Sequence, residues 1–124
     1  METHPTVVKP KTVLVVEDEP VLRMIALDYL ASVGFETVEA HSADEALALL
    51  ERQPAVTALF TDVQMPGSMD GIDLAAIATR RWPSILIIVT SGARQSSQRP
   101  LPERVTFLPK PYHLPAIAGL VAAA

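Results

Sequence analysis

Two stretches of this sequence, residues 13–16 and 85–89, are continuous runs of apolar residues in which β-branched side chains predominate. A strand with one wet face alternates apolar and polar residues, whereas a strand covered on both faces is apolar at every position. Strands of the second kind are typical of parallel sheets, whose faces are covered by helices. The two runs therefore predict a sheet that is buried on both sides.

Shorter apolar runs and helical patterns alternate with these two strands. Further strands are expected at residues 37–40, 58–61 and 105–108. Helices are expected from Pro20 to just before Gly34, from residue 42, from residue 70 to before Pro83, and over residues 114–122. Repeated strand–helix alternation implies right-handed crossovers. The sequence thus predicts an α/β fold with a doubly wound five-stranded parallel sheet, in a three-layer α/β/α sandwich.

Apolar spacing indicates which helical faces turn toward the sheet. In the first helix, residues at i, i+3, i+4, i+7, i+8 and i+11 form one face. That face consists of Leu22, Ile25, Ala26, Tyr29, Leu30 and Val33. The second helix opens with a capping box over residues 42–45. The residues expected to point inward from the second and third helices are Ala46, Leu47, Leu50, Leu74, Ile77 and Ala78.

The stretch from residue 92 to 103 has no apolar period and contains Pro100 and Pro102. Each proline removes a backbone donor and clashes with the preceding turn of a helix. We therefore expect a shortened or irregular fourth helix here, with at most a turn or two.

Size and composition exclude several classes of protein. The 124 residues suit one domain, and we expect a tail at 1–11 followed by a single domain at 12–124. The absence of cysteine excludes disulfides and thiolate metal sites and fits a cytoplasmic location. The net charge is −4, without a basic stripe interleaved with aromatic residues, so direct nucleic-acid binding is not expected. No apolar run is long enough to cross a bilayer, which predicts a soluble protein.

Polar side chains follow four of the expected strands. The first strand ends in Glu17 and Asp18, the third in Asp62, the fourth in Thr90 and Ser91, and the fifth in Lys110. In an open α/β sheet, ligands bind beyond the carboxyl ends of the strands. Three carboxylates held close together resist ionising at once, and a hard dication with oxygen ligands relieves their repulsion. These residues predict a magnesium site beside a lysine and a hydroxyl group.

The same residues lie in five ordered motifs that resemble response-regulator receiver domains of two-component signalling, over about residues 12–122. The motifs read VVEDE at 15–19, TDVQMP at 61–66, MDGIDL at 69–74, VTSG at 89–92 and FLPKP at 107–111. The resemblance implies a flavodoxin-like fold and a phosphoacceptor that catalyses its own phosphorylation and dephosphorylation, rather than an enzyme with an external substrate. The loop at 65–71 is one residue longer than is common in that family.

The resemblance also implies a role for each site residue. Asp62 would take a phosphoryl group from a histidine kinase or a histidine phosphotransfer protein. Glu17, Asp18, Asp62 and the backbone carbonyl of Gln64 would hold Mg²⁺. Thr90, Ser91 and Lys110 would contact the phosphoryl group, with Thr90 and Phe107 forming the switch. Contacts with a downstream protein target would then change, and a homodimer is one assembly that the resemblance allows.

Three other functions remain open from the residues themselves. A receiver-like module could work through protein contacts without being phosphorylated. A magnesium-dependent aspartyl phosphohydrolase would ordinarily have a second acid two residues after its nucleophile, where this chain has Gln64. A flavin-binding module would need a phosphate loop after the first strand, where the acids at 17–19 would repel phosphate.

Overall fold

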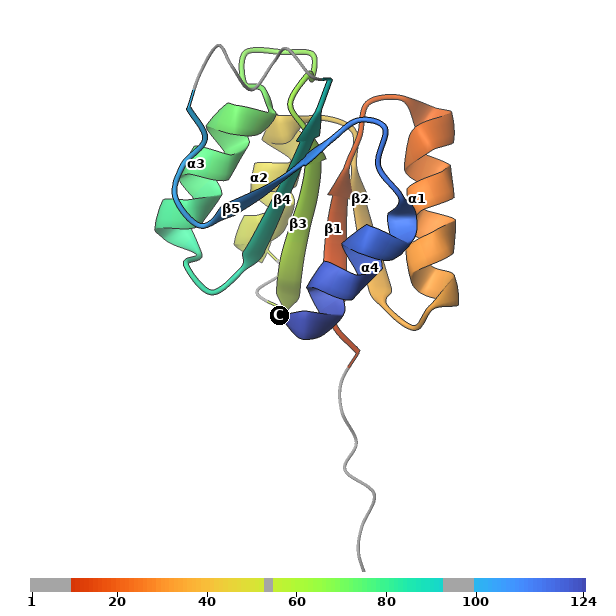
Figure 1. Ribbon diagram of the computed structural model, residues 1–124. Helices are drawn as coiled ribbons and strands as arrows, with labels where there is room; N and C mark the ends of the chain where they lie inside the picture. Colours follow the sequence, from red (N-terminus) through yellow and green to blue (C-terminus); the bar gives the residue numbers. More distant parts are fainter. Residues whose placement is uncertain (1–9, 53–54, 93–99) are drawn as a thin grey trace, which may run out of the picture.

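The structure is a computed structural model that describes residues 10–52, 55–92 and 100–124 (Figure 1). Over these ranges it contains five strands and four helices. The strands are β1 (Thr12–Val16), β2 (Glu36–Ala40), β3 (Val56–Asp62), β4 (Leu86–Ser91) and β5 (Val105–Pro109). The helices are α1 (Pro20–Ser32), α2 (Ala43–Arg52), α3 (Gly71–Arg81) and α4 (Leu114–Ala123). Each lies where the sequence predicts it, with ends that differ by up to two residues.

All five strands are parallel and lie in the order β2-β1-β3-β4-β5. The chain begins near the centre of the sheet, adds β2 on one side, and then builds the other side from β3 to β5. This is the doubly wound topology expected from the sequence. The register pairs Val16 with Thr61 and Asp62 with Thr90. The carboxyl ends of the three central strands therefore lie at one edge of the sheet.

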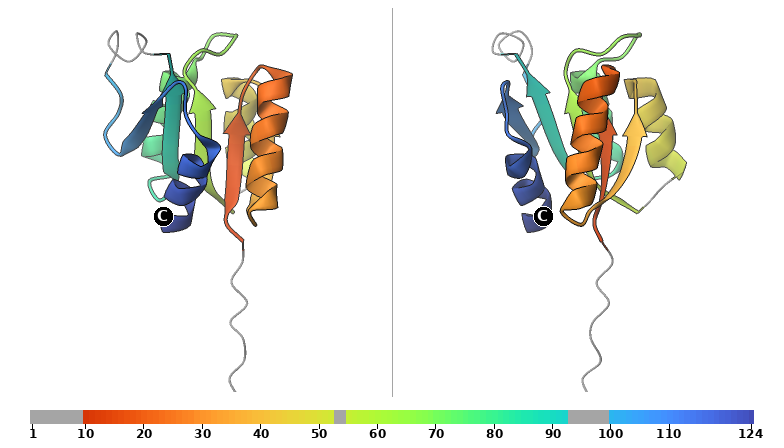
Figure 2. Two further views of the ribbon diagram at one scale, coloured as in Figure 1. Left: turned by 45° about the vertical axis from the view of Figure 1, so that its right-hand side comes forward. Right: turned by 90° about the vertical axis from the view of Figure 1, so that its right-hand side faces the viewer.

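Helices cover both faces of the sheet, which confirms the three-layer architecture (Figure 2). The helices α2 and α3 enclose one core with side chains from β1, β3 and β4, including Leu14, Leu50, Leu59 and Leu74. The helices α1 and α4 enclose a second core on the opposite face, including Val13, Leu30, Ile88 and Ile117. Burial of the continuous apolar runs on both faces supplies the main driving force for the fold.

The helix α1 begins as predicted, but its expected inner face is wrong in part. Glu19 is the N-cap, and its carboxylate accepts hydrogen bonds from the backbone N–H groups of Val21 and Leu22. Only Ala26 and Leu30 of the helix are buried. Leu22, Ile25 and Val33, predicted to lie on the inner face, are 47, 49 and 46% exposed. The short α4 covers only part of this layer, so one side of α1 remains apolar and open to solvent.

The helices α2 and α3 each begin within one residue of the predicted start. Ser42 Oγ accepts from the backbone N–H of Glu45, whereas the Glu45 carboxylate accepts from His41 rather than from Ser42. The helix α3 has a complete capping box between Asp70 and Asp73. Ala46, Leu50, Leu74 and Ala78 are buried as expected, and Leu47 and Ile77 are half-buried.

The expected irregular fourth helix falls largely at residues 93–99, which lie outside the described residues. Residues 100–104, which are described, form no helix. Arg104 adopts a left-handed backbone conformation with φ of 72° and donates to the carbonyl oxygen of Pro83 at 3.0 Å. The chain thus enters β5 through a tight turn.

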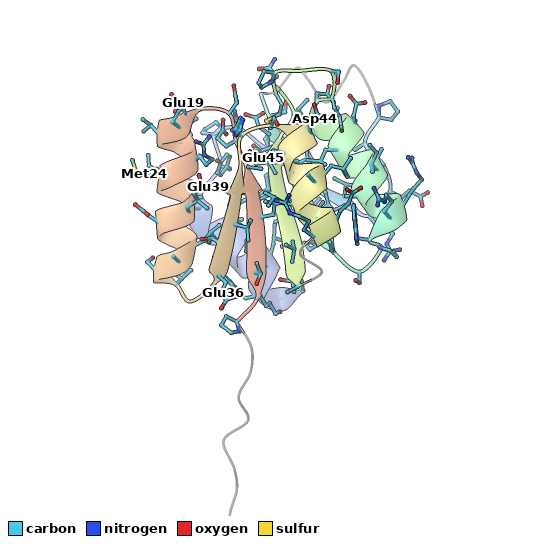
Figure 3. All side chains as sticks on the ribbon, turned by 180° about the vertical axis from the view of Figure 1, so that it is seen from behind. Glu19, Met24, Glu36, Glu39, Asp44 and Glu45 are labelled. Carbon is cyan, nitrogen blue, oxygen red and sulfur yellow. The ribbon has the colours of Figure 1, made fainter. Side chains whose placement is uncertain are left out.

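The edge strand β2 carries two exposed glutamates. Glu36 and Glu39 are exposed along this edge, as seen from behind in Figure 3. Charged side chains on an edge strand oppose pairing with strands of other molecules. Glu39 also contacts α1, because its carboxylate accepts a hydrogen bond from Arg23 Nε at 2.9 Å.

Candidate functional site

The structure brings Asp62 and Lys110 together at the carboxyl edge of the sheet. Lys110 Nζ lies 2.6 Å from Asp62 Oδ2. The side chain of Asp62 is 7% exposed, whereas that of Lys110 is 37% exposed. A carboxylate this deeply buried requires a partner for its charge, and the ammonium group provides it. The backbone N–H of Gln64 donates to the other oxygen, Oδ1, at 3.1 Å.

Glu17 is the second buried acid of this edge, with 8% exposure. Its Oε2 accepts from the backbone N–H of Glu19, and its own N–H donates to the carbonyl oxygen of Ala40. Burial raises the pKa of the Glu17 carboxyl, and the nearby charge of Asp62 raises it further, against the hydrogen bond from Glu19 and the charge of Lys110. The structure therefore places Glu17 and Asp62 near enough to repel each other, as the sequence predicts.

Asp18 and Gln64 lie at the same rim, but both are exposed. The neighbouring side chain of Asp18 also raises the pKa of the Glu17 carboxyl. Within residues 10–52, 55–92 and 100–124, no three acids or histidines converge closely enough to form a metal cluster by themselves. The predicted set of metal ligands is thus partly gathered: Glu17 and Asp62 are buried at this edge of the sheet, whereas Asp18 is exposed at the rim.

Thr90 contributes a buried hydroxyl without a hydrogen-bond partner among the described residues. The residue is 2% exposed and pairs with Asp62 in the β3–β4 ladder. Aligned residues on parallel strands project from the same face, so Thr90 and Asp62 share one side of the sheet. Because a buried hydroxyl without a partner is costly, this oxygen fits a site that receives a polar ligand.

Ser91 and Phe107 lie close to this edge but are otherwise engaged. Ser91 is 1% exposed, and its hydroxyl donates to the carbonyl oxygen of Gly92 at 3.0 Å. Phe107 pairs with Val89 and packs against the core beneath α2 and α3. Thr90 pairs instead with Leu108. The two expected switch residues therefore lie on adjacent strands, one register position apart.

Gly71 lies very close to the end of β3, which the motif at residues 69–74 does not reveal by itself. Its N–H donates to the carbonyl oxygen of Val63 at 2.8 Å. A Cβ at this position would lie 2.0 Å from the carbonyl oxygen of Asp62. Only glycine allows the start of α3 to pack this tightly behind Asp62.

Tyr112, two residues after Lys110, is a site neighbour that the sequence analysis missed. Its ring packs edge-on against Phe60, with ring centroids 5.4 Å apart. Burial raises the pKa of its phenol, and the charges of Glu17 and Asp62 raise it further. Tyr112 also lines an apolar groove of about 500 Å³, together with Leu22, Ile25, Ala26, Lys110, Pro111 and Leu114. An aromatic residue next to a predicted site lysine was the available signal.

The arrangement provides a carboxylate, an ammonium group and an unpaired hydroxyl on one side of the sheet. The oxygens of Glu17, Asp18 and Asp62 are the donor chemistry that Mg²⁺ prefers. Burial raises the pKa of the Glu17 carboxyl and the charge of Asp62 raises it further, so a bound cation would favour its ionised form. The residues therefore fit a hard dication together with a phosphoryl-sized anion.

Comparison with known proteins places this chain in a family. A family model for the response regulator receiver domain matches residues 13–121. The sensor kinase CckA of Brucella abortus is 40% identical over 114 residues, which cover 89% of this chain and 12% of that protein. Other curated relatives also extend well beyond the match: the chain spans 18% of the regulator HoxA of Cupriavidus necator and 24% of FleR of Pseudomonas aeruginosa.

Solved structures agree with the sequence comparison. A response regulator receiver protein from Pseudomonas putida superposes with a TM-score of 0.81 at 30% identity, covering 95% of this chain and 100% of that chain. The receiver domain of the hybrid histidine kinase CckA superposes with a TM-score of 0.75 at 33% identity, covering 90% and 96%. Across the described part of the chain, no helix is long and apolar enough to span a membrane.

Proposed function

This chain belongs to the response regulator receiver domains of two-component systems, and from that premise we propose that it accepts a phosphoryl group on Asp62. The observation that carries the proposal is the buried Asp62 carboxylate, 2.6 Å from Lys110 Nζ and beside the unpaired hydroxyl of Thr90. We propose that the chain acts as a phosphoacceptor rather than as an enzyme that turns over an external substrate. A cytoplasmic location is part of the same proposal.

In the proposed reaction, a carboxylate oxygen of Asp62 attacks the phosphorus of a phosphohistidine on a partner protein. The P–N bond breaks as the P–O bond forms, and the electron pair of the broken bond stays with the imidazole. Such transfers depend on positioning and charge neutralisation. Lys110 neutralises the charge of a phosphoryl oxygen, and the Thr90 hydroxyl donates a hydrogen bond to the phosphoryl group. Ser91 makes a further contact with the phosphoryl group once its hydroxyl releases the carbonyl oxygen of Gly92.

Glu17, Asp18, Asp62 and the carbonyl of Gln64 are the residues that would hold Mg²⁺. The ion would supply positive charge opposite the phosphoryl oxygens. Asp18, exposed at the rim, has to turn inward for this role. The acidic pair of Glu17 and Asp62 supports the assignment. Burial raises the pKa of Glu17 and the charge of Asp62 raises it further, and a dication would favour the ionised form of both acids.

The direct test is incubation with acetyl phosphate and Mg²⁺, followed by intact mass measurement. We expect one added phosphoryl group that is stable in acid and labile in base, and none for Asp62→Asn. Asp18→Ala should reduce labelling and weaken Mg²⁺ binding. Wild-type protein that gains no mass would favour the phosphorylation-independent interaction module, and steady turnover of a generic phosphate ester would favour the phosphohydrolase.

Phosphorylation is proposed to act through Thr90 and Phe107. Thr90 would move toward the phosphoryl oxygens, and Phe107 would shift from its half-buried place on β5. A comparison of NMR spectra with and without beryllofluoride, a phosphoryl mimic, tests this switch. Chemical shift changes confined to the acidic residues would contradict it, because the response has to reach β5.

The apolar side of α1 supports a protein as the phosphoryl donor. Leu22 and Ile25 line the groove that also includes Lys110, so a partner seated there brings its phosphohistidine close to Asp62. We propose that a histidine kinase or histidine phosphotransfer protein occupies this groove. Ile25→Glu should slow transfer from such a donor but leave acetyl phosphate labelling unchanged.

Met24→Glu is the matched control for this docking experiment. Met24 lies on the same helix and is 54% exposed, similar to Ile25, but it does not line the groove. Its side chain extends from α1 into solvent (Figure 3). Equal slowing by Ile25→Glu and Met24→Glu would argue against the groove as the docking site.

A further inference from the structure

We propose that Arg23 is a positioning residue that fixes the acidic loop between β1 and α1 for Mg²⁺ binding. This inference rests on the proposed function, and it assigns a role to a residue that lies outside the five sequence motifs. Among the described residues, Arg23 makes its side-chain hydrogen bonds to Glu39 and to the backbone of Glu17, not to Asp62 or Lys110.

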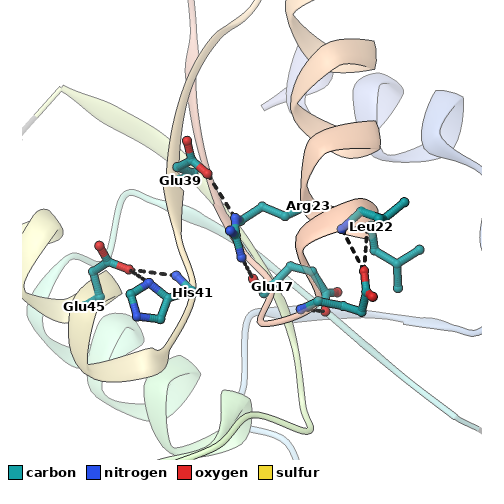
Figure 4. A network of polar contacts seen from close by, with 8 residues as sticks. Glu17, Leu22, Arg23, Glu39, His41 and Glu45 are labelled. Atoms are coloured by element: carbon teal, nitrogen blue, oxygen red, sulfur yellow. Dashed lines mark hydrogen bonds and ion pairs between the residues drawn. The ribbon is translucent and has the colours of Figure 1, made fainter.

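The guanidinium group of Arg23 spans two elements of the sheet (Figure 4). Its Nη1 donates to the backbone carbonyl oxygen of Glu17 at 2.7 Å, and its Nε donates to Glu39 Oε1 at 2.9 Å. Arg23 itself sits in the first turns of α1, where its N–H donates to the carbonyl oxygen of Glu19. One side chain therefore connects α1, the end of β1 and the edge strand β2.

The backbone N–H and the carbonyl group of Glu17 are therefore both connected to β2 by hydrogen bonds. The N–H of Glu17 donates to the carbonyl oxygen of Ala40 at 3.0 Å, and its carbonyl oxygen is held by Arg23, which is anchored on the neighbouring Glu39. The β1–β2 ladder ends at Val16 and Ala40. Arg23 thus extends the hydrogen-bonded connection between β1 and β2 by one residue beyond the ladder, to Glu17, the first of the acidic residues.

The bond to Glu17 distinguishes this pair from an ordinary surface ion pair. The side chain of Arg23 is 19% exposed, although that of Glu39 is 60% exposed. An exposed ion pair contributes little by itself, but a charged donor on a partly buried carbonyl is among the stronger hydrogen bonds. Because the contact is with the main chain and not with the carboxylate, we assign Arg23 a geometric effect rather than an electrostatic one.

Arg23→Lys separates these two effects, because lysine keeps the charge but lacks the planar fork that reaches both Glu17 and Glu39. We expect the Mg²⁺ dissociation constant, measured by calorimetry on the full chain, to rise about tenfold, as for other residues that orient metal ligands. Arg23→Gln should weaken binding to a similar degree. Glu39→Gln removes only the anchor, so we expect a change of about two- to threefold.

Arg81→Gln is the matched control. Arg81 pairs with Glu51 at 2.7 Å, also between two elements, but the pair lies away from the acidic loop, and both side chains are 48% exposed. We expect it to leave the Mg²⁺ dissociation constant unchanged. A second readout requires no metal: amide hydrogen exchange at Asp18 and Glu19 should accelerate in Arg23→Lys but not in Arg81→Gln, at matched global stability.

The outcomes separate this inference from the proposed function. Wild-type protein without saturable Mg²⁺ binding would refute the proposed metal site, and the role of Arg23 with it. Wild-type binding that Arg23→Lys leaves intact would overturn the role of Arg23 alone. A large effect of Arg23→Gln with none of Arg23→Lys would assign the effect to charge and would also overturn the positional role.

Discussion

Substitution of Gly71 by alanine is expected to damage stability and the proposed phosphoacceptor site together. The added Cβ would lie 2.0 Å from the carbonyl oxygen of Asp62, and 2.8 Å from the carbonyl carbon of Asp62 and the Cα of Val63. Contacts of a real Cβ essentially never fall below 3.0 Å, so one of the two segments has to retreat by about 1 Å. All three obstructing atoms belong to the backbone, which cannot rotate away as a side chain can.

The magnitude follows from this geometry. Overpacking in a well-packed region typically costs about 1–3 kcal/mol, and the upper end applies because β3 is a central strand of the sheet. We therefore expect a loss of about 3 kcal/mol in the free energy of unfolding, or a fall of about 10 °C in Tm. A displacement of about 1 Å at a reacting group can cost about 100-fold in rate, so labelling of Asp62 should slow accordingly.

Urea denaturation followed by circular dichroism measures the stability change, and intact mass during acetyl phosphate treatment measures the rate. Gly119→Ala in α4 is the control, because a Cβ there meets nothing within 4 Å. That substitution should instead stabilise the protein by up to about 1 kcal/mol, through helix propensity. Gly71→Ala with stability within about 0.5 kcal/mol of wild type, the usual range for a neutral surface substitution, would refute the reasoning.

Two further predictions concern titration and backbone strain. Burial and the charge of Asp62 raise the pKa of Glu17 in the folded protein above its ordinary value of 4.5, so the charged form destabilises the fold at neutral pH and the neutral form does not. Glu17→Gln should therefore raise the Tm of the metal-free protein at pH 7, and this increase in Tm should disappear as the pH falls below 4.5. An increase that persists below pH 4.5 would contradict the raised pKa of Glu17. Arg104 has a left-handed backbone, with φ of 72°. We expect Arg104→Gly to be more stable than Arg104→Ala by about 1 kcal/mol in urea denaturation, because both variants lose the hydrogen bond to Pro83 and only alanine keeps the left-handed strain. Equal stabilities of the two variants would contradict this prediction.

The sequence predicts the fold well because the controlling signals are local. Continuous apolar runs identify the buried strands, and Pro20 and Asp70 mark helix starts at or next to their observed places. The meeting of Asp62 and Lys110, 48 residues apart in sequence, follows from topology once both are placed at the carboxyl ends of parallel strands. The approach of these two side chains could be predicted from the sequence for the same reason.

What the sequence does not predict depends on contacts between elements. The periodicity of α1 gives one apolar face, but which residues are covered depends on the length and placement of α4, so Leu22 and Ile25 are exposed. The role of Arg23 requires knowing that β2 lies beside β1 and presents Glu39 to α1. The exposure of Asp18 at the rim depends on its side-chain conformation, which the spacing of residues in the sequence does not determine.

Lys110 belongs to two surroundings at once, since its ammonium group holds Asp62 and its side chain forms part of the wall of the apolar groove. Under the proposed function, recognition of the donor and reactivity of Asp62 therefore share one residue. Under the same proposal, substitution of Leu22, Ile25 or Leu114 would change which donor binds the groove and leave the reacting groups in place. No substitution at Lys110 has that freedom, so an isotope label on its ammonium group would register both the arrival of a donor and the modification of the aspartate.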